Sequence, residues 1–427
     1  SNRYRATHGT MNRIISLKEI HTDDRPRVGG KAYALWRLAD GGFNIPDTLC
    51  VTSDVYRAFV SQTGLRERIL LEINRKEFKE MRWEEIWDCA TRIRNIFLTQ
   101  GFPQDLYQDL HKTLQEHFQN RSVAVRSSAP DEDDAQSSFA GLHESYINLT
   151  GAEAIIKHIR LVWASLWSDA ALLYRQEIGL DVEKSTMAVV VQATIAGDSS
   201  GVVFTRDPNN RRQAVIESVH GLNQGLVDGE IEPDRWMIDR DSGDIVSHTK
   251  PERKHWFVPS QRGVDRAVLP GEKASRPPLD EQAVKTVWTT ALNAENYFQA
   301  PQDVEWTYAH QQLTLLQSRP ITTLGNGNPQ DQRGWYLSLH RSFENLKELR
   351  KKIEGELIPA MVKTAEDLGK TDLTQMSEEA LAREIRHRWE VNHKWVNIYW
   401  ADFIPYAHGV RLFGQVYNDA VQPEDPY

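Results

Sequence analysis

Residues 302–320 read QDVEWTYAHQQLTLLQSRP, and this stretch predicts a β-hairpin that carries polar residues on both arms. Two strand-like runs, DVEWTY and LTLLQSR, flank a short polar segment. Asp303 and Glu305 interrupt the first run, and Gln317 and Arg319 interrupt the second. The pattern fits either a solvent-facing ladder of opposite charges or a site for a metal ion and a phosphate.

The register of this hairpin decides whether its polar side chains share one face. Side chains alternate between the two faces of a strand, so the two acids share a face, and so do Gln317 and Arg319. A register in which Ala309 pairs with Leu313 brings both sets to the same face. Its polar pairs are Glu305 with Gln317 and Asp303 with Arg319. This register requires an odd loop such as His310-Gln311-Gln312, and a shift by one residue would separate the two sets.

In the predicted register the hairpin has the donor atoms of a metal–phosphate site. Glu305 and Gln317 would supply oxygen ligands for magnesium, which usually keeps several waters and takes further ligands from nucleotide phosphates. Arg319 would contact a phosphate or hold Asp303 in place. From the hairpin alone, the solvent-facing ladder of charges stays an open alternative.

The length and charge of the chain restrict its class. It has 427 residues, too many for one ordinary core, which predicts two or three domains. The net charge of −9, without a long basic run, argues against nucleic-acid binding and against anionic membranes. No segment approaches the roughly 18 apolar residues of a transmembrane helix. Cys50 and Cys89 show no metal-binding spacing, so we expect a reduced, cytoplasmic protein.

Helical and strand-like patterns alternate along the chain, which predicts an α+β architecture. Residues 1–10 have the character of a tag or a flexible arm, and residues 11–323 of a folded domain. Residues 324–334 are rich in Gly, Asn, Gln and Asp and are expected to form a linker. Residues 335–427 are expected to be mostly helical and to begin a further domain. Within the folded domain, GAEAIIKHIRLVWASLWSDAALLYRQEIG, from Gly151, predicts one long helical stretch.

The segment VGGKAYAL sets Gly29, Gly30 and Lys31 at the start of a predicted helix. Glycines let the backbone approach a ligand, a helix N-terminus favours anions, and the lysine adds positive charge. The spacing is not that of a P-loop, and two glycines before a helix are often only a turn.

The segment SVAVRSSAPDEDDAQSSFAG predicts a buried strand that ends near Arg126, followed by an acidic loop. An arginine at a strand end suits phosphate binding. Ser137, Ser138 and Gly141 would then belong to a lid over the phosphates, although a solvated acidic loop explains the same composition. The run MAVVVQATIAG sets Gln192 near the end of a strand, where backbone groups could pair with an adenine edge.

Six stretches of the sequence together resemble one family. In order along the chain, they are VGGKAYAL with GFNIPDTLCVT, VAVRSSAPDEDDAQSSFAGLHESYINL, LVWASLWSDAALLYRQEIG, SGVVFTRDP, GLNQGLVDGEIEPD, and DVEW with LLQSRPIT. This family is the nucleotide-binding domain shared by phosphoenolpyruvate synthase, pyruvate phosphate dikinase and rifampin phosphotransferase. The matching stretches span residues 28–322. The resemblance implies an ATP-grasp fold with two lobes that binds ATP and Mg2+.

The resemblance also implies a role for each matching residue. Lys31 and Arg126 match the phosphate-contacting lysine and arginine, and Arg319 matches the arginine at the triphosphate; these three are the expected catalytic residues. Glu305 and Gln317 match the magnesium ligands, with Asp303 beside them. The segment around Gln192 corresponds to the adenine hinge, and the loop with Ser137, Ser138 and Gly141 to the phosphate cover.

The sequence departs from the family pattern at two places near the expected nucleotide. The family usually has GLGE where this chain has GLNQ, so that Asn223 replaces a glycine and Gln224 a glutamate that is expected near the nucleotide. Four acids, Asp131, Glu132, Asp133 and Asp134, are clustered in the loop over the expected phosphates and would repel them at close range unless they face solvent or metal.

Family members pass phosphate through a histidine in a TGGxxSHxAI-like stretch, and this sequence has none; His408 has the nearest setting. We therefore expect the histidine phosphocarrier on a further domain or on a partner subunit. The resemblance predicts a dikinase-type phosphotransferase with a small-molecule acceptor such as pyruvate, a drug, a phenol or a glucan. A nucleotide-binding regulatory subunit without turnover remains an alternative. An ATP-grasp ligase is a third reading, and the family stretches argue against it.

Overall fold

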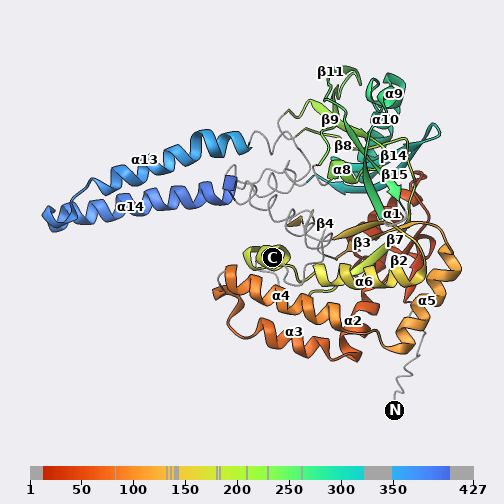
Figure 1. Ribbon diagram of the computed structural model, residues 1–427, viewed down its shortest axis with the longest axis horizontal. Coiled ribbons are helices and arrows are strands. Elements are labelled where there is room, and N and C mark those ends of the chain that lie inside the picture. Colours follow the sequence, from red (N-terminus) through yellow and green to blue (C-terminus); the bar gives the residue numbers. More distant parts are fainter. Residues whose placement is uncertain are drawn as a thin grey trace, which may run out of the picture. The chain divides into compact units, whose positions relative to one another are not determined.

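The computed structural model describes residues 13–81, 83–130, 133–134, 137–138, 144–178, 181, 184–207, 210–227, 230–260, 263–321 and 349–403. The chain forms two compact units (Figure 1). The first comprises Ser1–Gly225 and Pro233–Gly325, and the second comprises Leu226–Glu232 and Asn326–Tyr427. The expected arm at 1–10 and linker at 324–334 lie outside the described residues.

The first unit contains two antiparallel sheets, the first sheet and the second sheet. The first sheet has the order β1 (Ile14–Ser16), β2 (Thr48–Val51), β7 (Ala188–Ala193), β3 (Val123–Ser128) and β6 (Ser145–Leu149). The second sheet has the order β11 (Ile245–Thr249), β10 (Asp234–Asp239), β9 (Gln213–His220), β8 (Ser199–Phe204), β14 (Gln302–Ala309) and β15 (Gln312–Pro320). Two small ribbons pair β12 (His255–Ser260) with β13 (Gly263–Val268) and β4 (Asp133–Asp134) with β5 (Ser137–Ser138).

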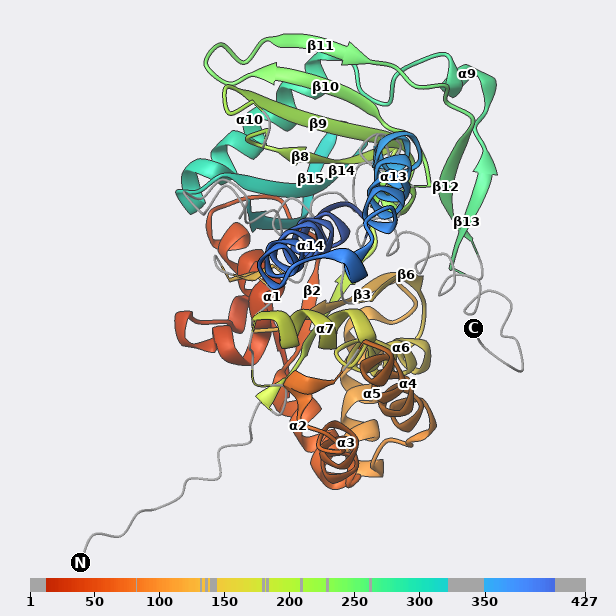
Figure 2. The ribbon, with the colours of Figure 1, turned by 90° about the vertical axis from the view of Figure 1, so that its left-hand side faces the viewer.

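Helices alternate with these strands along the chain (Figure 2). They are α1 (Arg25–Asp40), α2 (Ser53–Gln62), α3 (Leu65–Ile73), α4 (Trp83–Thr99), α5 (Gln104–Phe118), α6 (Ala152–Ser165), α7 (Asp169–Ile178), α8 (Gln224–Val227), α9 (Gly271–Ala274) and α10 (Glu281–Phe298). Short 3-10 turns occupy Leu17–Glu19, Thr22–Asp24 and Phe78–Glu80. The described part of the chain therefore confirms the predicted mixture of helices and sheets.

Strand alternation divides the buried residues of the first unit between two cores. Val189 and Val191 of β7 belong to a core built with α2, α4, α5 and α6. Val190, from the opposite face of the same strand, belongs to a core that includes α1, α10 and the inner face of the second sheet. Helix α1 therefore packs against both sheets.

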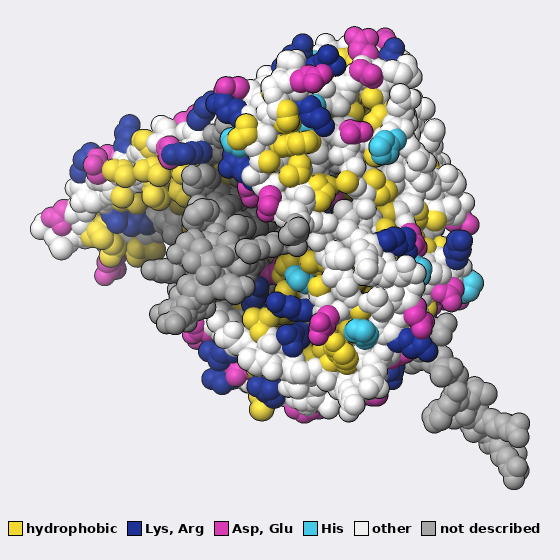
Figure 3. All heavy atoms as spheres, turned by 45° about the vertical axis from the view of Figure 1, so that its right-hand side comes forward, with side chains coloured by type: hydrophobic (Ala, Val, Ile, Leu, Met, Phe, Trp, Pro, Cys, Tyr) yellow, Lys and Arg dark blue, Asp and Glu magenta, His cyan; other side chains and the backbone are white. Residues whose placement is uncertain are grey.

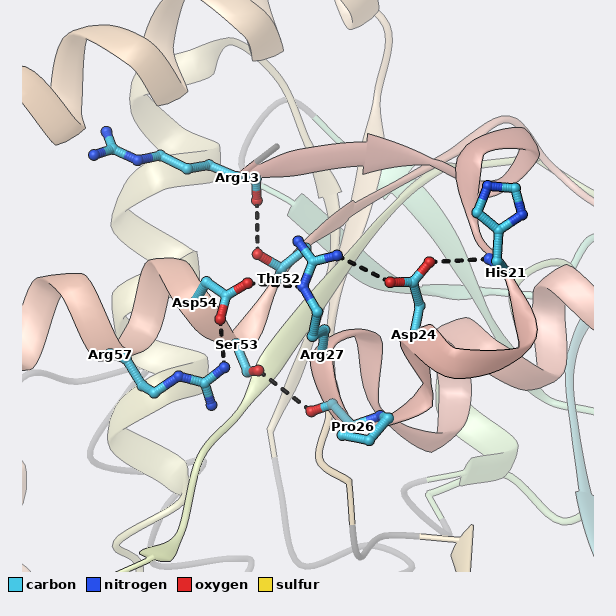
Figure 4. Close-up of polar contacts among 9 residues, drawn as sticks. All are labelled: Arg13, His21, Asp24, Pro26, Arg27, Thr52, Ser53, Asp54 and Arg57. Atoms are coloured by element: carbon cyan, nitrogen blue, oxygen red, sulfur yellow. Dashed lines mark hydrogen bonds and ion pairs between the residues drawn. The ribbon is translucent and has the colours of Figure 1, made fainter. Parts of the chain in front are cut away.

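Polar contacts anchor the start of α1 to α2 (Figure 4). Arg27 donates from Nε to Asp54 at 2.8 Å and from Nη1 to Asp24 at 2.9 Å. Arg57 also pairs with Asp54, and Ser53 Oγ donates to the carbonyl of Pro26 at 3.4 Å. Burial alone would raise the pKa of the Asp54 carboxyl, but hydrogen bonds from Arg27 and Arg57 hold that pKa below its ordinary value.

The long helical stretch predicted from Gly151 is wrong, because it forms two helices. Helix α6 ends at Ser165 and α7 begins at Asp169. The side chain of Ser168 accepts a hydrogen bond from the backbone N–H of Ala171 at 3.2 Å, as an N-cap does. A polar cap within an apolar periodic run was the local signal for this break.

The surface and the helices give two further observations. On the face drawn in Figure 3, basic and acidic side chains lie interspersed over the residues coloured by type. Within the ranges that the structure describes, no helix is long and apolar enough to cross a membrane.

In the second unit, most of the described residues after position 348 are helical. Helix α13 (Ile358–Gly369) and helix α14 (Glu378–Ile398) are joined through a 3-10 turn at Leu373–Gln375. Arg388 donates to the carbonyl of Leu368 at 2.7 Å, which links the two helices.

Helix α1 is interrupted at Gly29, whose backbone has φ 76° and ψ 173°. A Cβ atom built there would lie 1.9 Å from the carbonyl oxygen of Ser128 at the end of β3. Both the left-handed backbone and this contact require glycine. The close approach holds the helical turn that follows Gly29, with Lys31, against the end of β3.

We predict that Gly29→Ala lowers the free energy of unfolding by about 2–5 kcal/mol, because overpacking costs about 1–3 and a left-handed residue about 1–2 kcal/mol. Gly151→Ala is the matched control, since Gly151 has a similar backbone, with φ 86° and ψ 144°, but no atom within 4 Å of the added Cβ. The control should lose only the conformational part, about 1–2 kcal/mol. Denaturant unfolding of both variants measures the difference, and equal losses would contradict the steric role of Ser128.

Candidate functional site

The hairpin of β14 and β15 brings the predicted polar pairs together. Its paired positions include Glu305 with Gln317 and Asp303 with Arg319, as the sequence predicted. The predicted loop is wrong: Ala309 pairs with Gln312, and the turn has two residues, His310 and Gln311, with φ of 50° and 62°. Positive φ at both turn positions is the geometry of a tight two-residue hairpin.

A β-bulge explains why the two-residue turn still gives the predicted residue pairs. The register shifts between Glu305 and Trp306, where Trp306 pairs with Leu315 and Glu305 with Gln317. Leu316 is therefore the extra residue on β15. One inserted residue reverses which face the following side chains occupy, so the bulge turns Gln317 and Arg319 to the face of Glu305.

Paired positions across the second sheet define a polar face. Glu305 pairs with Val202 of β8 as well as with Gln317, and Val202 pairs with Glu217 of β9. Directly paired residues point to the same side of a sheet, so these side chains share one face. Asp303, Glu305 and Gln317 are 4, 5 and 4 % exposed. The opposite face, with Val304 and Trp306, belongs to the apolar core with α10.

Arginines compensate the buried carboxylates on the polar face. Arg319 donates to one carboxylate oxygen of Asp303 from Nε at 2.8 Å and from Nη2 at 2.7 Å. Arg126 of β3 donates from Nη1 to Glu305 Oε2 at 3.1 Å. The second contact joins the first sheet to the second sheet. Buried ions are costly to leave unpaired, so each arginine stabilises the carboxylate with which it pairs.

The start of α1 lies against the end of β3. The amide of Gly30 donates to the carbonyl of Ala129 at 3.0 Å, and Lys31 Nζ donates to Ser127 Oγ at 3.1 Å. Ser128 Oγ donates to the carbonyl of Val28 at 2.7 Å and accepts from the amide of Ala32 at 3.1 Å. These contacts bring Lys31 to the strand that carries Arg126.

Sequence reasoning missed one acid–base pair on the same face. Glu217 of β9 is 1 % exposed and accepts a hydrogen bond from Arg235 Nε of β10 at 2.8 Å. The available signal was an acid inside the apolar run QAVIESV, paired with an arginine in RWMID. Without the strand order, neither residue could be connected to Glu305.

The remaining predicted residues have separate positions. Ser137 and Ser138 form β5 and pair with Asp134 and Asp133, while Gly141 lies outside the described residues. Gln192 is buried in β7, and its Nε2 donates to the carbonyl of Leu316 at 3.3 Å.

Gln224 opens α8, directly after the strand that carries Glu217. Its buried Oε1 has no hydrogen-bond partner within the described chain, and the same holds for both amide atoms of Asn223. Buried polar atoms are usually hydrogen-bonded, so these amides are candidates for contact with a ligand.

The donor set suits a magnesium-bound polyphosphate. Glu305 and Gln317 offer paired oxygen donors, and Arg126 of β3 and Lys31 of α1 offer positive charge. Arg126 Nε is buried and has no hydrogen-bond partner among the described residues, so it can accommodate a further acceptor such as a phosphate oxygen. No cluster of three or more His, Cys, Asp or Glu side chains suited to a metal occurs in the described ranges. Magnesium held here would depend on phosphate and water ligands.

Fold and site together are those of a mixed helix-and-sheet domain with a buried, charge-compensated polar sheet face. Residues 25–336 match the family described as "Pyruvate phosphate dikinase, AMP/ATP-binding domain". The chain belongs to this family.

Individual relatives agree with the family match. The chain is 31% identical over 328 residues to the "Probable phosphoenolpyruvate synthase" of Methanocaldococcus jannaschii, covering 74% of this chain and 27% of that protein. It is 30% identical over 315 residues to the "Rifampicin phosphotransferase" of Bacillus cereus, covering 73% and 36%. It is 32% identical over 348 residues to the "Phosphoenolpyruvate synthase" of Aeropyrum pernix, covering 72% and 42%. The chain thus spans less than half the length of these relatives.

We predict that Arg126 and Glu305 are energetically coupled. A double-mutant cycle of Arg126→Met and Glu305→Gln, measured by denaturant unfolding, should give a coupling energy of about 1–3 kcal/mol, as contacting ion pairs do. Lys254 and Glu252 form the control pair, since they lie 2.8 Å apart but are 61 and 78 % exposed. The control should give less than about 1 kcal/mol. Equal coupling in the two cycles would contradict the inter-sheet role of the Arg126 pair.

Proposed function

We propose that this chain binds magnesium-ATP on the polar face of the second sheet, within an ATP-grasp domain. The observation that carries the proposal is the hairpin register, in which Glu305 pairs with Gln317 and Asp303 with Arg319. Arg126 of β3 and Lys31 of α1, which donates to Ser127 on the same strand, add positive charge. The matched AMP/ATP-binding family supports the nature of the ligand.

Binding would require an exchange of ionic partners. In the structure, Glu305 accepts from Arg126. With the ligand in place, Glu305 and Gln317 would hold magnesium, which supplies charge neutralisation at the phosphates. Arg126, Arg319 and Lys31 would contact phosphate oxygens and stabilise the charge that develops during transfer. Asp303 would keep Arg319 oriented through the two hydrogen bonds to its guanidinium.

The reaction we propose is a dikinase-type phosphotransfer. A histidine nitrogen on a phosphocarrier domain or partner subunit attacks the β-phosphorus of ATP; the bond to the α-phosphate oxygen breaks, and AMP leaves. Water then removes the γ-phosphate as inorganic phosphate, and the phosphohistidine passes its phosphoryl group to an acceptor. The names of the relatives support pyruvate or a drug as the acceptor, with a phenol or a glucan as alternatives.

A second candidate is a nucleotide-binding regulatory subunit without turnover. The observation that favours it is Gln224, an amide at the position where the resemblance leads us to expect a glutamate. Its Oε1 is buried without a hydrogen-bond partner in the described residues. An amide can contact a nucleotide, but it carries no charge and cannot serve as a general base as a carboxylate does.

We predict that Glu305→Ala combined with Gln317→Ala weakens magnesium-ATP binding by about tenfold or more, or about 1.4 kcal/mol, because both metal-facing oxygens are removed. Isothermal titration calorimetry with ATP and magnesium measures the change. Gln312→Ala is the control, since Gln312 is exposed on the same strand and pairs with Ala309 at the turn. Unchanged affinity in the double variant would refute the metal assignment.

We further predict that AMP forms when the full-length protein, or this chain with its histidine-bearing partner, is incubated with ATP labelled at the α-phosphate. Lys31→Met and Arg126→Met should each lower the rate by about 100-fold or more, since removed transition-state contacts cost on that scale. Thin-layer chromatography separates labelled AMP from ADP. Formation of ADP would contradict the dikinase reaction, and binding without turnover would favour the regulatory subunit.

A further inference from the structure

The bulge at Leu316 decides which side chains of β15 reach the polar face. Near the turn, Trp306 pairs with Leu315. If that register continued without an extra residue, Glu305 would pair with Leu316, and Gln317 would pair with Val304. Gln317 would then point into the apolar core with Val304, and Arg319 would follow it. The proposed metal and phosphate contacts on β15 therefore depend on the bulge.

A bulge interrupts the ladder and needs other hydrogen bonds to stabilise it. The carbonyl of Leu316 accepts from Gln192 Nε2 at 3.3 Å. Gln192 is 1 % exposed and lies in the first sheet, where its neighbours are Thr48 and Ala124 on the adjacent strands. Its main chain is thus held in the middle of a sheet, and its side chain extends to a strand far away in sequence.

Asn44 holds β15 on the other side of the bulge. The amide of Leu315 donates to the Asn44 carbonyl at 2.9 Å. Asn44 Nδ2 lies 3.0 Å from the carbonyl of Leu313 and 2.8 Å from Thr314 Oγ1. Because β15 is the edge strand of the second sheet, these contacts replace those of a neighbouring strand. Residues from outside the second sheet thereby fix β15 immediately before and at its extra residue.

We infer that Gln192 is a positioning residue that fixes the bulge at Leu316, so that Gln317 and Arg319 face the proposed magnesium-ATP. This inference rests on the proposed function. Gln192 acts through the main chain of β15, and its amide need not touch the ligand. The arrangement also connects the segment expected to meet adenine with the strand expected to meet magnesium.

The main test compares Gln192→Leu with the unchanged protein. Gln192→Leu keeps the approximate volume and removes the donor. We expect ATP affinity with magnesium to fall by about tenfold, the scale for residues that orient metal ligands, and ATP affinity in the presence of EDTA to fall less, since only the Arg319 contact is then affected. Hydrogen exchange at the amides of residues 315–319 should become faster. Gln176→Leu is the matched control, because Gln176 Nε2 also donates to a backbone carbonyl, that of Met81 at 3.1 Å, away from β15.

A second variant separates positioning from general stability. In Gln192→Glu, a carboxylate would repel the Leu316 carbonyl, whereas a protonated carboxyl group would donate to it. Magnesium-dependent affinity should therefore recover as the pH is lowered from 8 to about 5.5, since burial raises the pKa of a carboxyl group. A loss of packing alone would not recover with pH. If Gln192→Leu does not fold, Asn44→Ala, at an exposed position, supplies the same exchange measurement on β15.

The outcomes separate the inference from the proposed function. If the unchanged protein binds magnesium-ATP and the Gln192 variants match it in affinity and in exchange, the inference is overturned and the proposed function stands. If the unchanged protein does not bind magnesium-ATP, the proposed function fails. In that case hydrogen exchange at residues 315–319 tests the role of Gln192 at the bulge independently of ligand binding. Faster exchange in Gln192→Leu than in Gln176→Leu supports this role, and equal exchange overturns it.

Discussion

The compensation of buried charge is the constraint on which the site depends. Asp303, Glu305 and Glu217 are almost fully buried on one sheet face, and an uncompensated carboxylate there would be protonated or would destabilise the fold. Arg319 and Arg235 come from neighbouring strands of the same sheet, but the partner of Glu305 comes from β3 in the other sheet. The polar face is therefore stable only when the two sheets are joined. The same ionic contact that joins them is the one that a bound cation and phosphate would replace.

The site also depends on the close packing of α1 against the end of β3. Gly29 allows the start of α1 to approach the carbonyl of Ser128, and Ser128 in turn hydrogen-bonds to both sides of the glycine. Lys31 is thereby held against β3, where its Nζ donates to Ser127 Oγ. Positions fixed by backbone contacts need little reorganisation when a charged ligand binds, and reorganisation is a major part of the cost of binding polyanions.

Prediction from the sequence was most successful where the alternation of side chains along a strand could be combined with the positions of polar residues. The pairs Glu305–Gln317 and Asp303–Arg319 were predicted correctly, although the loop was not. The predicted loop was one residue too long, and the bulge further along β15 cancelled the effect of this error. The tight turn and the bulge each change which face the following side chains occupy, and neither has a distinct signal in AHQQLTLLQ. Glu217 was missed because it is connected to Glu305 only through Val202, which pairs with both residues. These two strand pairings can be known only from the fold. The contact of Gln192 with Leu316 spans 124 residues and likewise has no local signal.

The replacement of the family glutamate by Gln224 can be considered through the charge of the site. On the described polar face and in α1, four cationic side chains stand against four anionic ones. They are Lys31, Arg126, Arg235 and Arg319 against Glu217, Asp239, Asp303 and Glu305. A glutamate after β9 would add a negative charge to this balanced set, whereas the amide of Gln224 adds none. If the face binds magnesium-ATP as proposed, the amide gives up one anionic cation ligand and spares the phosphates one repulsive charge.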